Sequence, residues 1–383
     1  MKIRGIIYTL LFITAISIPL IFCDFGKDRV SAIDNKLLAN FPELSDIKGN
    51  PARFFSRFND WFNDSTGFRE PMIKLYISLS NSKWLNKVRY KEGTNVFLYG
   101  EDGHIYFADT NGWLISKFQG KPFLSDNELI DFSNRIEMIN KYLAPQGIPL
   151  LFMICPDKET IYPEFYPKSI IKGAEPNQLE VFTNYLKKNT NAVVFNISNG
   201  LFSQKENFLL YPKLDTLADA PYDAAHYNQI AAFFGYQELM KYINIYFPQM
   251  NAFELSDVVI RHEDYGPNVK LNPENITSME LDKTFFSNIN LDRPYLSHIN
   301  AAYQNNNKNL PVLLFLRDSY TYFNYIEQYI PQHFGKSILL HNPNIKYIKE
   351  YLDFFKPDIV IIESGERGLI NFYNHLKKTI EFN

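Results

Sequence analysis

One serine lies between a predicted strand and a predicted helix, a position from which its hydroxyl could act as a nucleophile. Ser319 follows the apolar run 311–316 (PVLLFL), which predicts a buried strand, and it precedes a predicted helix at 320–334. A residue between a strand end and a helix start lies at the edge of a sheet, where the first N–H groups of the helix are free to stabilise an oxyanion. The alternative is that Asp318 and Ser319 only cap the helix.

A histidine occupies a second helix start. Residues 222–228 read YDAAHYN, and the helix predicted at 224–245 places His226 in its first turn, three residues after Asp223. At this spacing a carboxylate can orient the imidazole, whose other nitrogen then faces a nucleophile. The alternative is that Asp223 is an N-cap and His226 an ordinary surface residue. Taken together, the two segments predict a triad of Ser319, His226 and Asp223.

Strands and helices alternate around these residues. Continuous apolar strands between helices predict an α/β fold with a mainly parallel sheet covered on both faces, in three α/β/α layers. In such sheets the active site lies beyond the carboxyl ends of the strands. The predicted strands are 149–155, 192–197, 311–316, 337–341 and 358–363, and the predicted helices are 127–144, 175–188, 224–245, 320–334 and 345–355.

The two blocks carry a family resemblance. DAAHYN at 223–228 resembles the Asp-x-x-His block of SGNH hydrolases, and RDSY at 317–320 resembles their Gly-Asp-Ser block. Here the His block precedes the Ser block, an order that resembles the AlgX/AlgJ-like (DHHW) polysaccharide O-acetyltransferases and implies a circularly permuted SGNH-like domain. The chain departs from the family's Asp-x-His-Trp pattern, with Ala224 two residues before His226 and Tyr227 in place of Trp.

Further segments follow the family in the same order. NKLLANFPEL at 35–44, WFNDSTGFRE at 61–70, NVFLYGEDGHIYF at 95–107, PDKETIYPE at 156–164 and KPDIVIIESGERGL at 356–369 resemble its motifs. The hairpin-like segment 93–107 predicts two strands around a Gly-Glu-Asp-Gly turn. Residues 51–90 predict a helical region, in which Phe54, Phe55, Phe58, Trp61 and Phe62 recur at helical spacing and are expected to face a core.

Five residues are predicted to bind substrate. They are Lys158, Tyr162, Tyr227, Arg317 and Arg367. Lys158 follows a predicted strand and is expected to reach the edge of the sheet, where it would bind a glycan or acyl oxygen; the alternative is a solvated loop lysine. Arg367 follows the last strand, and the alternative for it is a structural pairing with Glu363 or Glu366.

The resemblance implies an O-acetyltransferase that moves acetyl groups to hydroxyls of an extracytoplasmic polysaccharide through a serine acyl-enzyme. It also implies a membrane-bound O-acyltransferase as a partner that relays acetyl groups. Two alternatives remain: a carbohydrate acetyl esterase of the same fold, and a non-catalytic polysaccharide-assembly factor. No cofactor is expected, and no metal, because no Cys/His pair has the spacing of zinc ligands.

The composition bounds the class of protein. The chain has 383 residues, of which 46% are hydrophobic and 21% charged, so it buries a normal core. Its formal net charge of −3 provides no basic field to bind nucleic acid. The two cysteines, Cys23 at the end of an apolar run and Cys155 in a predicted strand, are not expected to form a disulfide.

The amino terminus predicts a membrane segment. Lys2 and Arg4 flank an uncharged stretch at 5–22, and this pattern is typical of a signal peptide or a signal anchor. An uncleaved anchor is favoured, with the protein at the inner membrane on its periplasmic or extracytoplasmic side. The predicted domains are 1–23 as anchor or signal peptide, 24–90 as stalk and helical region, and 91–383 as the catalytic domain with an insertion around 252–310.

Overall fold

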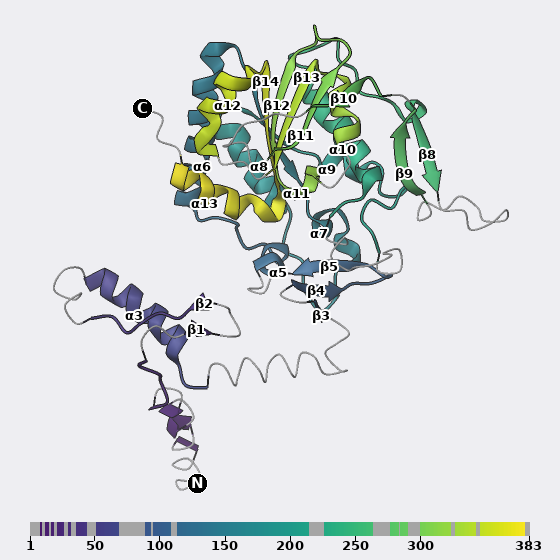
Figure 1. Cartoon of the computed structure of the whole chain (residues 1–383). Coiled ribbons are helices and arrows are strands. Elements are labelled where there is room, and N and C mark those ends of the chain that lie inside the picture. Colours follow the sequence, from purple (N-terminus) through teal and green to yellow (C-terminus); the bar gives the residue numbers. More distant parts are fainter. Residues whose placement is uncertain are drawn as a thin grey trace. The chain divides into compact units, whose positions relative to one another are not determined.

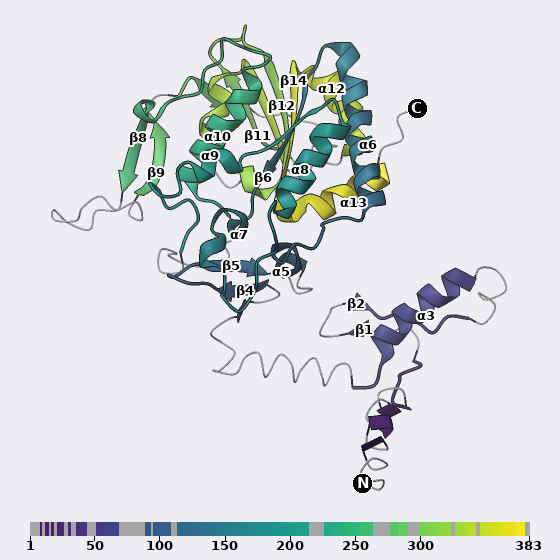
Figure 2. The same ribbon diagram turned by 180° about the vertical axis from the view of Figure 1, so that it is seen from behind.

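A computed structural model places most of the chain in two compact units, Met1–Arg89 and Tyr90–Asn383, which are considered separately (Figures 1 and 2). The described residues are 8–9, 12–14, 17–18, 21–26, 30–31, 36–43, 51–68, 89–92, 95–108, 113–213, 226–262, 276–282, 284–289, 299–322, 326–341 and 345–379.

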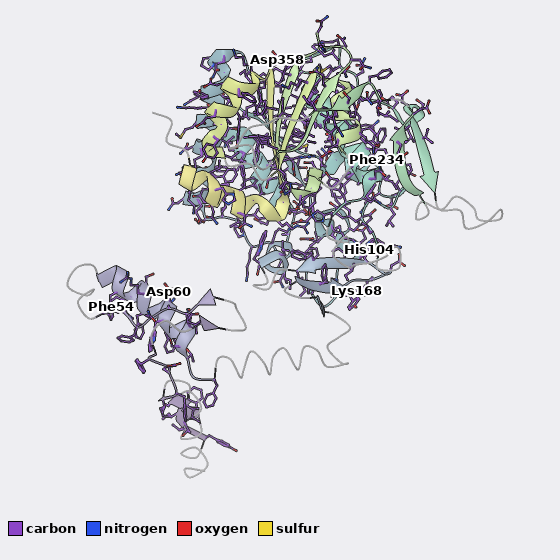
Figure 3. All side chains as sticks on the ribbon, viewed as in Figure 1. Phe54, Asp60, His104, Lys168, Phe234 and Asp358 are labelled. Carbon is purple, nitrogen blue, oxygen red and sulfur yellow. The ribbon has the colours of Figure 1, made fainter. Side chains whose placement is uncertain are left out.

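The first unit is built on one amphipathic helix. Helix α3 (Pro51–Ser65) accompanies the short antiparallel strands β1 (Val30–Ser31) and β2 (Lys36–Leu37). The expected core-facing stripe is correct for Phe54 and Trp61, which are buried, but wrong for Phe55 and Phe58, which are 67% and 37% exposed, and Phe62 is half-buried. Figure 3 labels Phe54 together with Asp60, an exposed residue of the same helix.

The predicted anchoring in the inner membrane is contradicted. No helix in the described part of the chain is long and apolar enough to cross a bilayer. Within the apolar stretch 5–22, only 8–9, 12–14, 17–18 and 21–22 belong to that part.

The second unit is organised around a seven-stranded sheet with the order β10-β11-β13-β12-β14-β6-β7. Its five strands from β13 to β7 are mutually parallel, whereas β10 and β11 add to one edge in antiparallel pairing. The bounds are β6 (Leu150–Cys155), β7 (Val193–Asn196), β10 (Phe286–Asn288), β11 (Ile299–Asn305), β12 (Val312–Arg317), β13 (Lys336–His341) and β14 (Ile359–Gly365).

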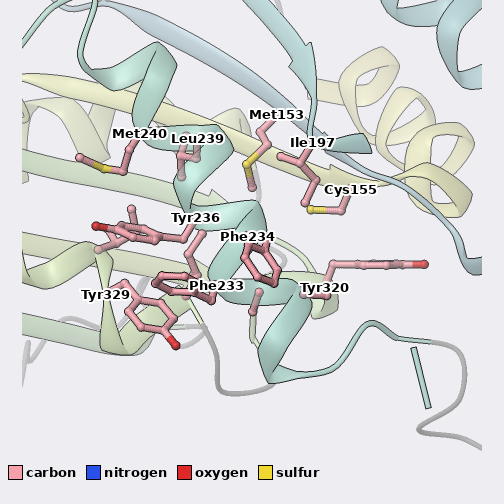
Figure 4. Packing of buried hydrophobic residues seen from close by; sticks show 14 of the residues in the cluster. Met153, Cys155, Ile197, Phe233, Phe234, Tyr236, Leu239, Met240, Tyr320 and Tyr329 are labelled. Carbon is pink, nitrogen blue, oxygen red and sulfur yellow. The ribbon is translucent and has the colours of Figure 1, made fainter. Parts of the chain in front are cut away.

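Helices cover both faces of this sheet, as the apolar strands predicted (Figures 1 and 2). One face carries α7 (Lys158–Ile161), α9 (Ser198–Phe202) and α10 (Gln229–Ile243), and the other carries α6 (Asp126–Leu143), α8 (Gln178–Asn189), α12 (Ile348–Phe355) and α13 (Leu369–Thr379). Alternate residues of β6 enter opposite cores: Met153 packs with the first group of helices and Phe152 with the second. Figure 4 shows the first core, where Met153 and Cys155 of β6 lie near Phe234 of α10.

Two smaller sheets complete the unit. Strands β4 (Asn95–Tyr99) and β5 (Ile105–Ala108) pair in antiparallel fashion beside β3 (Arg89–Glu92), which confirms the hairpin predicted at 93–107, although residues 93–94 lie outside the described part. Strands β8 (Val258–His262) and β9 (Ile276–Leu281) form a separate hairpin. The remaining short elements are α5 (Trp113–Phe118), η1 (Ala144–Gln146), η2 (Pro163–Phe165), η5 (Leu255–Asp257), η10 (Ile345–Tyr347) and η11 (Glu366–Gly368).

The helices predicted next to His226 and Ser319 differ in the structure. Helix α10 begins at Gln229, so its predicted start at 224 was too early. The predicted helix 320–334 is replaced by three short pieces, α11 (Ser319–Tyr322), η8 (Ile326–Gln328) and η9 (Ile330–Gln332). Pro331 lies inside η9 and lacks the N–H that a continuous helix would need. Helix α13 was not anticipated, and the segment 252–310 supplies β10 and β11 to the central sheet.

Candidate active site

Ser319 and His226 are in contact although 93 residues separate them in the chain. The Nε2 atom of His226 lies 3.1 Å from Oγ of Ser319. Strand β12 ends at Arg317 and α11 begins at Ser319, so the hydroxyl stands at the carboxyl edge of the parallel strands. The structure therefore brings together the predicted nucleophile and the predicted general base.

The segment that carries His226 is fixed by the residue that caps α10. Asn228 donates its side-chain amide to the carbonyl oxygen of Leu209 at 2.6 Å and its N–H to that of Leu210 at 2.9 Å. Its side-chain oxygen accepts the first N–H groups of α10. His226 thus lies two residues before the N-cap of a helix that is tied to a neighbouring segment.

The imidazole is uncharged at neutral pH, although burial makes it a weaker base than a free histidine. Burial, and then the positive charge of Arg367, lowers the pKa of His226 to about 3. At neutral pH the ring is therefore uncharged and can take the proton of the Ser319 hydroxyl at Nε2. The ring also packs edge-on against Tyr320, with 5.1 Å between the two centroids. Asp223, the predicted third member of the triad, lies outside the described residues, so its role stays a prediction.

Asp318 fixes the turn that presents the serine. Its carboxylate accepts the N–H of Tyr320 at 2.8 Å and the N–H of Gly365, at the end of β14, at 2.6 Å. Glu363 accepts the N–H of Asp318 at 3.0 Å and the hydroxyl of Thr321 at 2.9 Å. The capping role considered for Asp318 is therefore real, and it accompanies the contact between Ser319 and His226.

The same turn restricts the choice of oxyanion donor. Because the N–H of Tyr320 is donated to Asp318, it is not available to a substrate. The N–H of Ser319 donates to no acceptor in the described part of the chain. Of the two backbone groups at this helix start, Ser319 is the one that remains to stabilise an oxyanion.

A buried cluster of charges, which sequence reasoning missed, lies next to this turn. The ammonium group of Lys117, on α5, lies 2.8 Å from Asp157, 2.8 Å from Glu159 and 2.9 Å from Glu366. All four side chains are buried. Glu366 also accepts the N–H of Asp157 at 2.8 Å and the hydroxyl of Thr160 at 2.7 Å. We call Lys117, Asp157, Glu159 and Glu366 the lysine cluster.

The lysine cluster combines ionised and protonatable carboxyl groups. Burial works against the charge of Lys117, but the three carboxylates outweigh it and hold its pKa well above the usual value. For Asp157, burial is likewise outweighed by Lys117 and Arg367, and its pKa is lowered. Burial raises the pKa of Glu159 to about 7 and also raises that of Glu366. Asp157 is thus the firmly ionised member.

Asp157 connects the lysine cluster to the active site. Its carboxylate accepts the hydroxyl of Tyr320, the residue after Ser319, and lies 3.8 Å from Nε of Arg367. Asp157, Ser319 and Arg367 follow the ends of the adjacent parallel strands β6, β12 and β14. The register of the sheet therefore gathers these residues at one edge.

Arg367 is held by aromatic rings. Its guanidinium carbon lies 4.8 Å from the ring centroid of Tyr320 and 5.2 Å from that of Phe107. The side chain is 17% exposed, and it donates no hydrogen bond to any described residue. The alternative pairing with Glu363 or Glu366 is not observed, since its carboxylate neighbour in the described part is Asp157.

The other four predicted substrate-binding residues are buried. Arg317 donates to the carbonyl oxygen of Thr321 at 2.8 Å and pairs with Glu327, so its guanidinium stabilises the segment after Ser319. Lys158 donates to the carbonyl oxygen of Pro212 at 2.6 Å, so it is not the solvated lysine of the alternative.

The two tyrosines of that group belong to the first core. The hydroxyl of Tyr162 accepts the N–H of Leu210 at 3.1 Å, and that of Tyr227 lies 3.7 Å from the sulfur of Cys155. Substrate contact by Lys158, Tyr162, Tyr227 or Arg317 stays a prediction, and it would require these side chains to become accessible.

A cavity of about 400 Å³ opens beside Ser319. Its wall includes Ser319, Arg317 and Arg367 among the predicted site residues, and Trp113 and Phe107 among residues that were not predicted. Its volume falls within the range of small-molecule sites, about 300–1,000 Å³. In the described part of the chain, no group of His, Cys, Asp or Glu is arranged to hold a metal ion.

Sequence patterns gave few indications of the residues in the lysine cluster and in the cavity wall. Glu366 directly follows β14 and Asp157 lies two residues after β6, and these positions could have indicated them. Lys117, Trp113 and Phe107 come from outside the predicted strand–helix alternation, so no pattern placed them at the site.

The comparisons with known proteins agree with this architecture. A DHHW family protein from Eubacterium siraeum DSM 15702 is 12% identical with a TM-score of 0.51, and the match covers 77% of this chain and 98% of that chain. Bacillus cereus PatB1 is 17% identical with a TM-score of 0.50, over 72% of this chain and 97% of that chain. The O-acetyltransferase domain of Pseudomonas putida AlgJ is also found, at 13% identity over 73% of this chain and 98% of that chain, but its TM-score of 0.42 is too low to support an argument.

These likenesses concern the fold. At that level, the match to the DHHW family protein confirms the resemblance to the AlgX/AlgJ-like (DHHW) family that the motifs predicted. No protein-family model matches the chain, and a search of curated proteins finds no match.

Proposed function

We propose that this chain is a serine O-acyltransferase that moves acetyl groups to hydroxyls of a polysaccharide. The observation that carries the proposal is the 3.1 Å contact between Nε2 of His226 and Oγ of Ser319. The choice of acetyl group and polysaccharide rests on the motif resemblance, and the fold shared with a DHHW family protein supports it. Because the His226 block precedes the Ser319 block, the domain is proposed to be a circularly permuted SGNH-type fold.

The first half-reaction forms an acyl-enzyme. Oγ of Ser319 bonds to the carbonyl carbon of an acetyl ester while Nε2 of His226 accepts the hydroxyl proton. The N–H of Ser319 stabilises the oxyanion of the tetrahedral intermediate. The bond to the donor's alkoxy oxygen then breaks, and His226 returns the proton to that oxygen. In this proposal Asp223 orients the imidazole.

The second half-reaction transfers the acetyl group. His226 accepts a proton from a sugar hydroxyl, whose oxygen bonds to the acetyl carbonyl carbon. The ester bond to Ser319 breaks, and Oγ takes the proton back from His226. Arg367 is proposed to bind oxygen atoms of the substrate, because its guanidinium lines the same cavity and is held in place by two rings. A membrane-bound O-acyltransferase stays the proposed partner that supplies acetyl groups.

The test is direct detection of acetyl-Ser319. The full chain is incubated with 4-nitrophenyl acetate, quenched and examined by peptide mass spectrometry. We expect acetylation at Ser319, none there in Ser319→Ala, and acylation slowed by about 10²–10⁴-fold in His226→Gln. Ser203→Ala, which alters an exposed serine outside the site, is the matched control and should acylate normally. Nitrophenolate release at the wild-type rate by Ser319→Ala would contradict the proposal.

Adding oligosaccharide separates the other candidate functions. A transferase moves acetyl to sugar, whereas an acetyl esterase releases only acetate in the presence or absence of oligosaccharide. If a fluorophosphonate fails to label Ser319 and the protein still binds glycan, a non-catalytic assembly factor is the better description.

A further inference from the structure

The surface of the cavity beside Ser319 is aromatic and polar rather than aliphatic. Its four aliphatic lining residues are each at most 3% exposed and contribute only a floor: Leu114, Leu316, Ile345 and Ile362. The partly exposed rings are those of Phe107, Trp113 and Phe372. The accessible polar side chains include Arg367 and Asn371.

Trp113 is fixed in this wall by neighbours outside the cavity. Its ring lies 5.9 Å from the ring of Phe123 between centroids, and the ammonium of Lys117 lies 5.9 Å from its centroid. Lys117 is itself held by the lysine cluster. Trp113 therefore offers a preorganised ring to a ligand, so little conformational entropy is lost on binding.

Arg367 provides the complementary polar contact. Two rings, those of Phe107 and Tyr320, hold its guanidinium, and its donors form no hydrogen bond within the described part of the chain. Asn371, which is exposed on α13, adds an amide to the same wall. The guanidinium of Arg367 is held in place beside partly exposed rings, and its N–H groups form no hydrogen bond with a described residue. Such a site suits a ligand with an apolar face and an edge of hydroxyl groups.

A sugar ring has these two properties. Its C–H face packs on aromatic rings, and its hydroxyls accept hydrogen bonds from guanidinium and amide groups. The acetyl group alone, with three heavy atoms, fills only a small part of a cavity of about 400 Å³. We therefore infer that this cavity binds one sugar ring of the acceptor against Trp113 and Phe107, with Arg367 holding its hydroxyls. The inference rests on the proposed acyl transfer and adds the location and recognition of the acceptor.

The experiment compares wild type with Trp113→Ala and Trp113→Phe in the full chain. The acyl donor is 4-nitrophenyl acetate, and the probes are cellopentaose, chitopentaose and pentagalacturonate. Two quantities are measured: binding of each oligosaccharide by saturation-transfer NMR, and the ratio of acetyl-sugar to free acetate. This ratio is internal to each variant, so a change in the acylation rate does not affect it.

We expect wild type to bind at least one of the three oligosaccharides. Trp113→Ala should lower the binding signal and reduce the transfer ratio at least tenfold, whereas Trp113→Phe, which keeps a ring, should retain most of both. Tyr246→Ala is the control, because it removes an exposed ring outside the cavity, and it should match wild type. Far-ultraviolet circular dichroism of each variant verifies the fold.

Three results would overturn the inference. The first is that wild type binds none of the three probes. The second is that Trp113→Ala binds and transfers as well as wild type. The third is that Trp113→Ala changes the preference among acetyl, butyryl and octanoyl donors and leaves the transfer ratio unaffected. The last result would assign the cavity to an acyl chain. Failure of the proposed function gives a different result, since wild type would then form no acetyl-Ser319.

Discussion

Removal of the Lys117 ammonium should destabilise the protein strongly. In Lys117→Met, three buried carboxyl groups that lie 2.8, 2.8 and 2.9 Å from Nζ lose their common partner. Glu366 keeps the N–H of Asp157 and the Thr160 hydroxyl, whereas Glu159 keeps no hydrogen bond in the described part of the chain. Breaking a buried ion pair on one side costs about 3–5 kcal/mol, equivalent to a drop in Tm of about 6–20 °C.

The pH dependence tests the electrostatic origin of this loss. Burial already raises the pKa of Glu159 to about 7 in the folded wild type, so this group favours folding at low pH and loses that contribution as the pH rises toward 7. Without Lys117, the folded-state pKa values of Glu159 and Glu366 should rise further, because an opposing positive charge has gone. The stability gap between wild type and Lys117→Met should therefore be smaller at pH 5 than at pH 8, and the part that remains at pH 5 comes from Asp157, which stays ionised.

The assay is urea unfolding of both proteins at the two pH values, followed by circular dichroism. Lys168→Met is the matched control, because Lys168 (labelled in Figure 3) is 78% exposed and lies 3.5 Å from an exposed Glu101. This variant should unfold like wild type at both pH values. A loss below about 1 kcal/mol for Lys117→Met at pH 8, or a gap that does not shrink at pH 5, would refute the reasoning.

Three further predictions concern the residues around Ser319. Because burial and Arg367 lower the pKa of His226 to about 3, fluorophosphonate labelling of Ser319 should change by less than about twofold between pH 5 and pH 8; a midpoint near 6.5 would contradict this. In Gly365→Ala the new Cβ would lie 2.4 Å from the Tyr320 ring, so we expect a loss of about 1–3 kcal/mol in urea unfolding and slower labelling, and an unchanged midpoint would exclude the clash. Tyr320→Phe removes the hydroxyl donated to Asp157 and should lower stability by about 1–3 kcal/mol, whereas Tyr246→Phe, at an exposed ring, should not; equal midpoints for the two variants would speak against the contact.

The lysine cluster gives the site a rigid support. It joins α5, the turn after β6 and the turn after β14, and through Asp157 it reaches Tyr320 and Arg367. Residues that hold a nucleophile and its neighbours need a locked environment of their own, since small displacements are costly for acyl transfer. Lys117 and its three carboxylate partners provide this environment at the edge of the sheet where β6, β12 and β14 end.

Local patterns in the sequence determined the elements of the α/β unit. The strands predicted at 149–155, 192–197, 311–316, 337–341 and 358–363 all occur within two residues of the predicted bounds. Buried parallel strands are continuous apolar runs, which local composition reveals directly. The types and flanking elements of Ser319 and His226 also sufficed to select them, because a strand end and a helix start are local features.

Contacts between distant segments were decided only by the tertiary structure. Lys117 meets its carboxylates from two other segments, and a buried lysine has no periodicity that would distinguish it from a surface one. The segment after Ser319 forms short pieces and not one helix. Pro331 lacks the N–H that a helix would need there, and the carbonyl oxygen of Thr321 accepts a hydrogen bond from Arg317. The 3.1 Å contact between His226 and Ser319 depends on the packing of α10 on the sheet and on Asn228, which ties the start of this helix to Leu209 and Leu210. The sequence pointed to the two groups that are proposed to react, and tertiary packing placed them in contact.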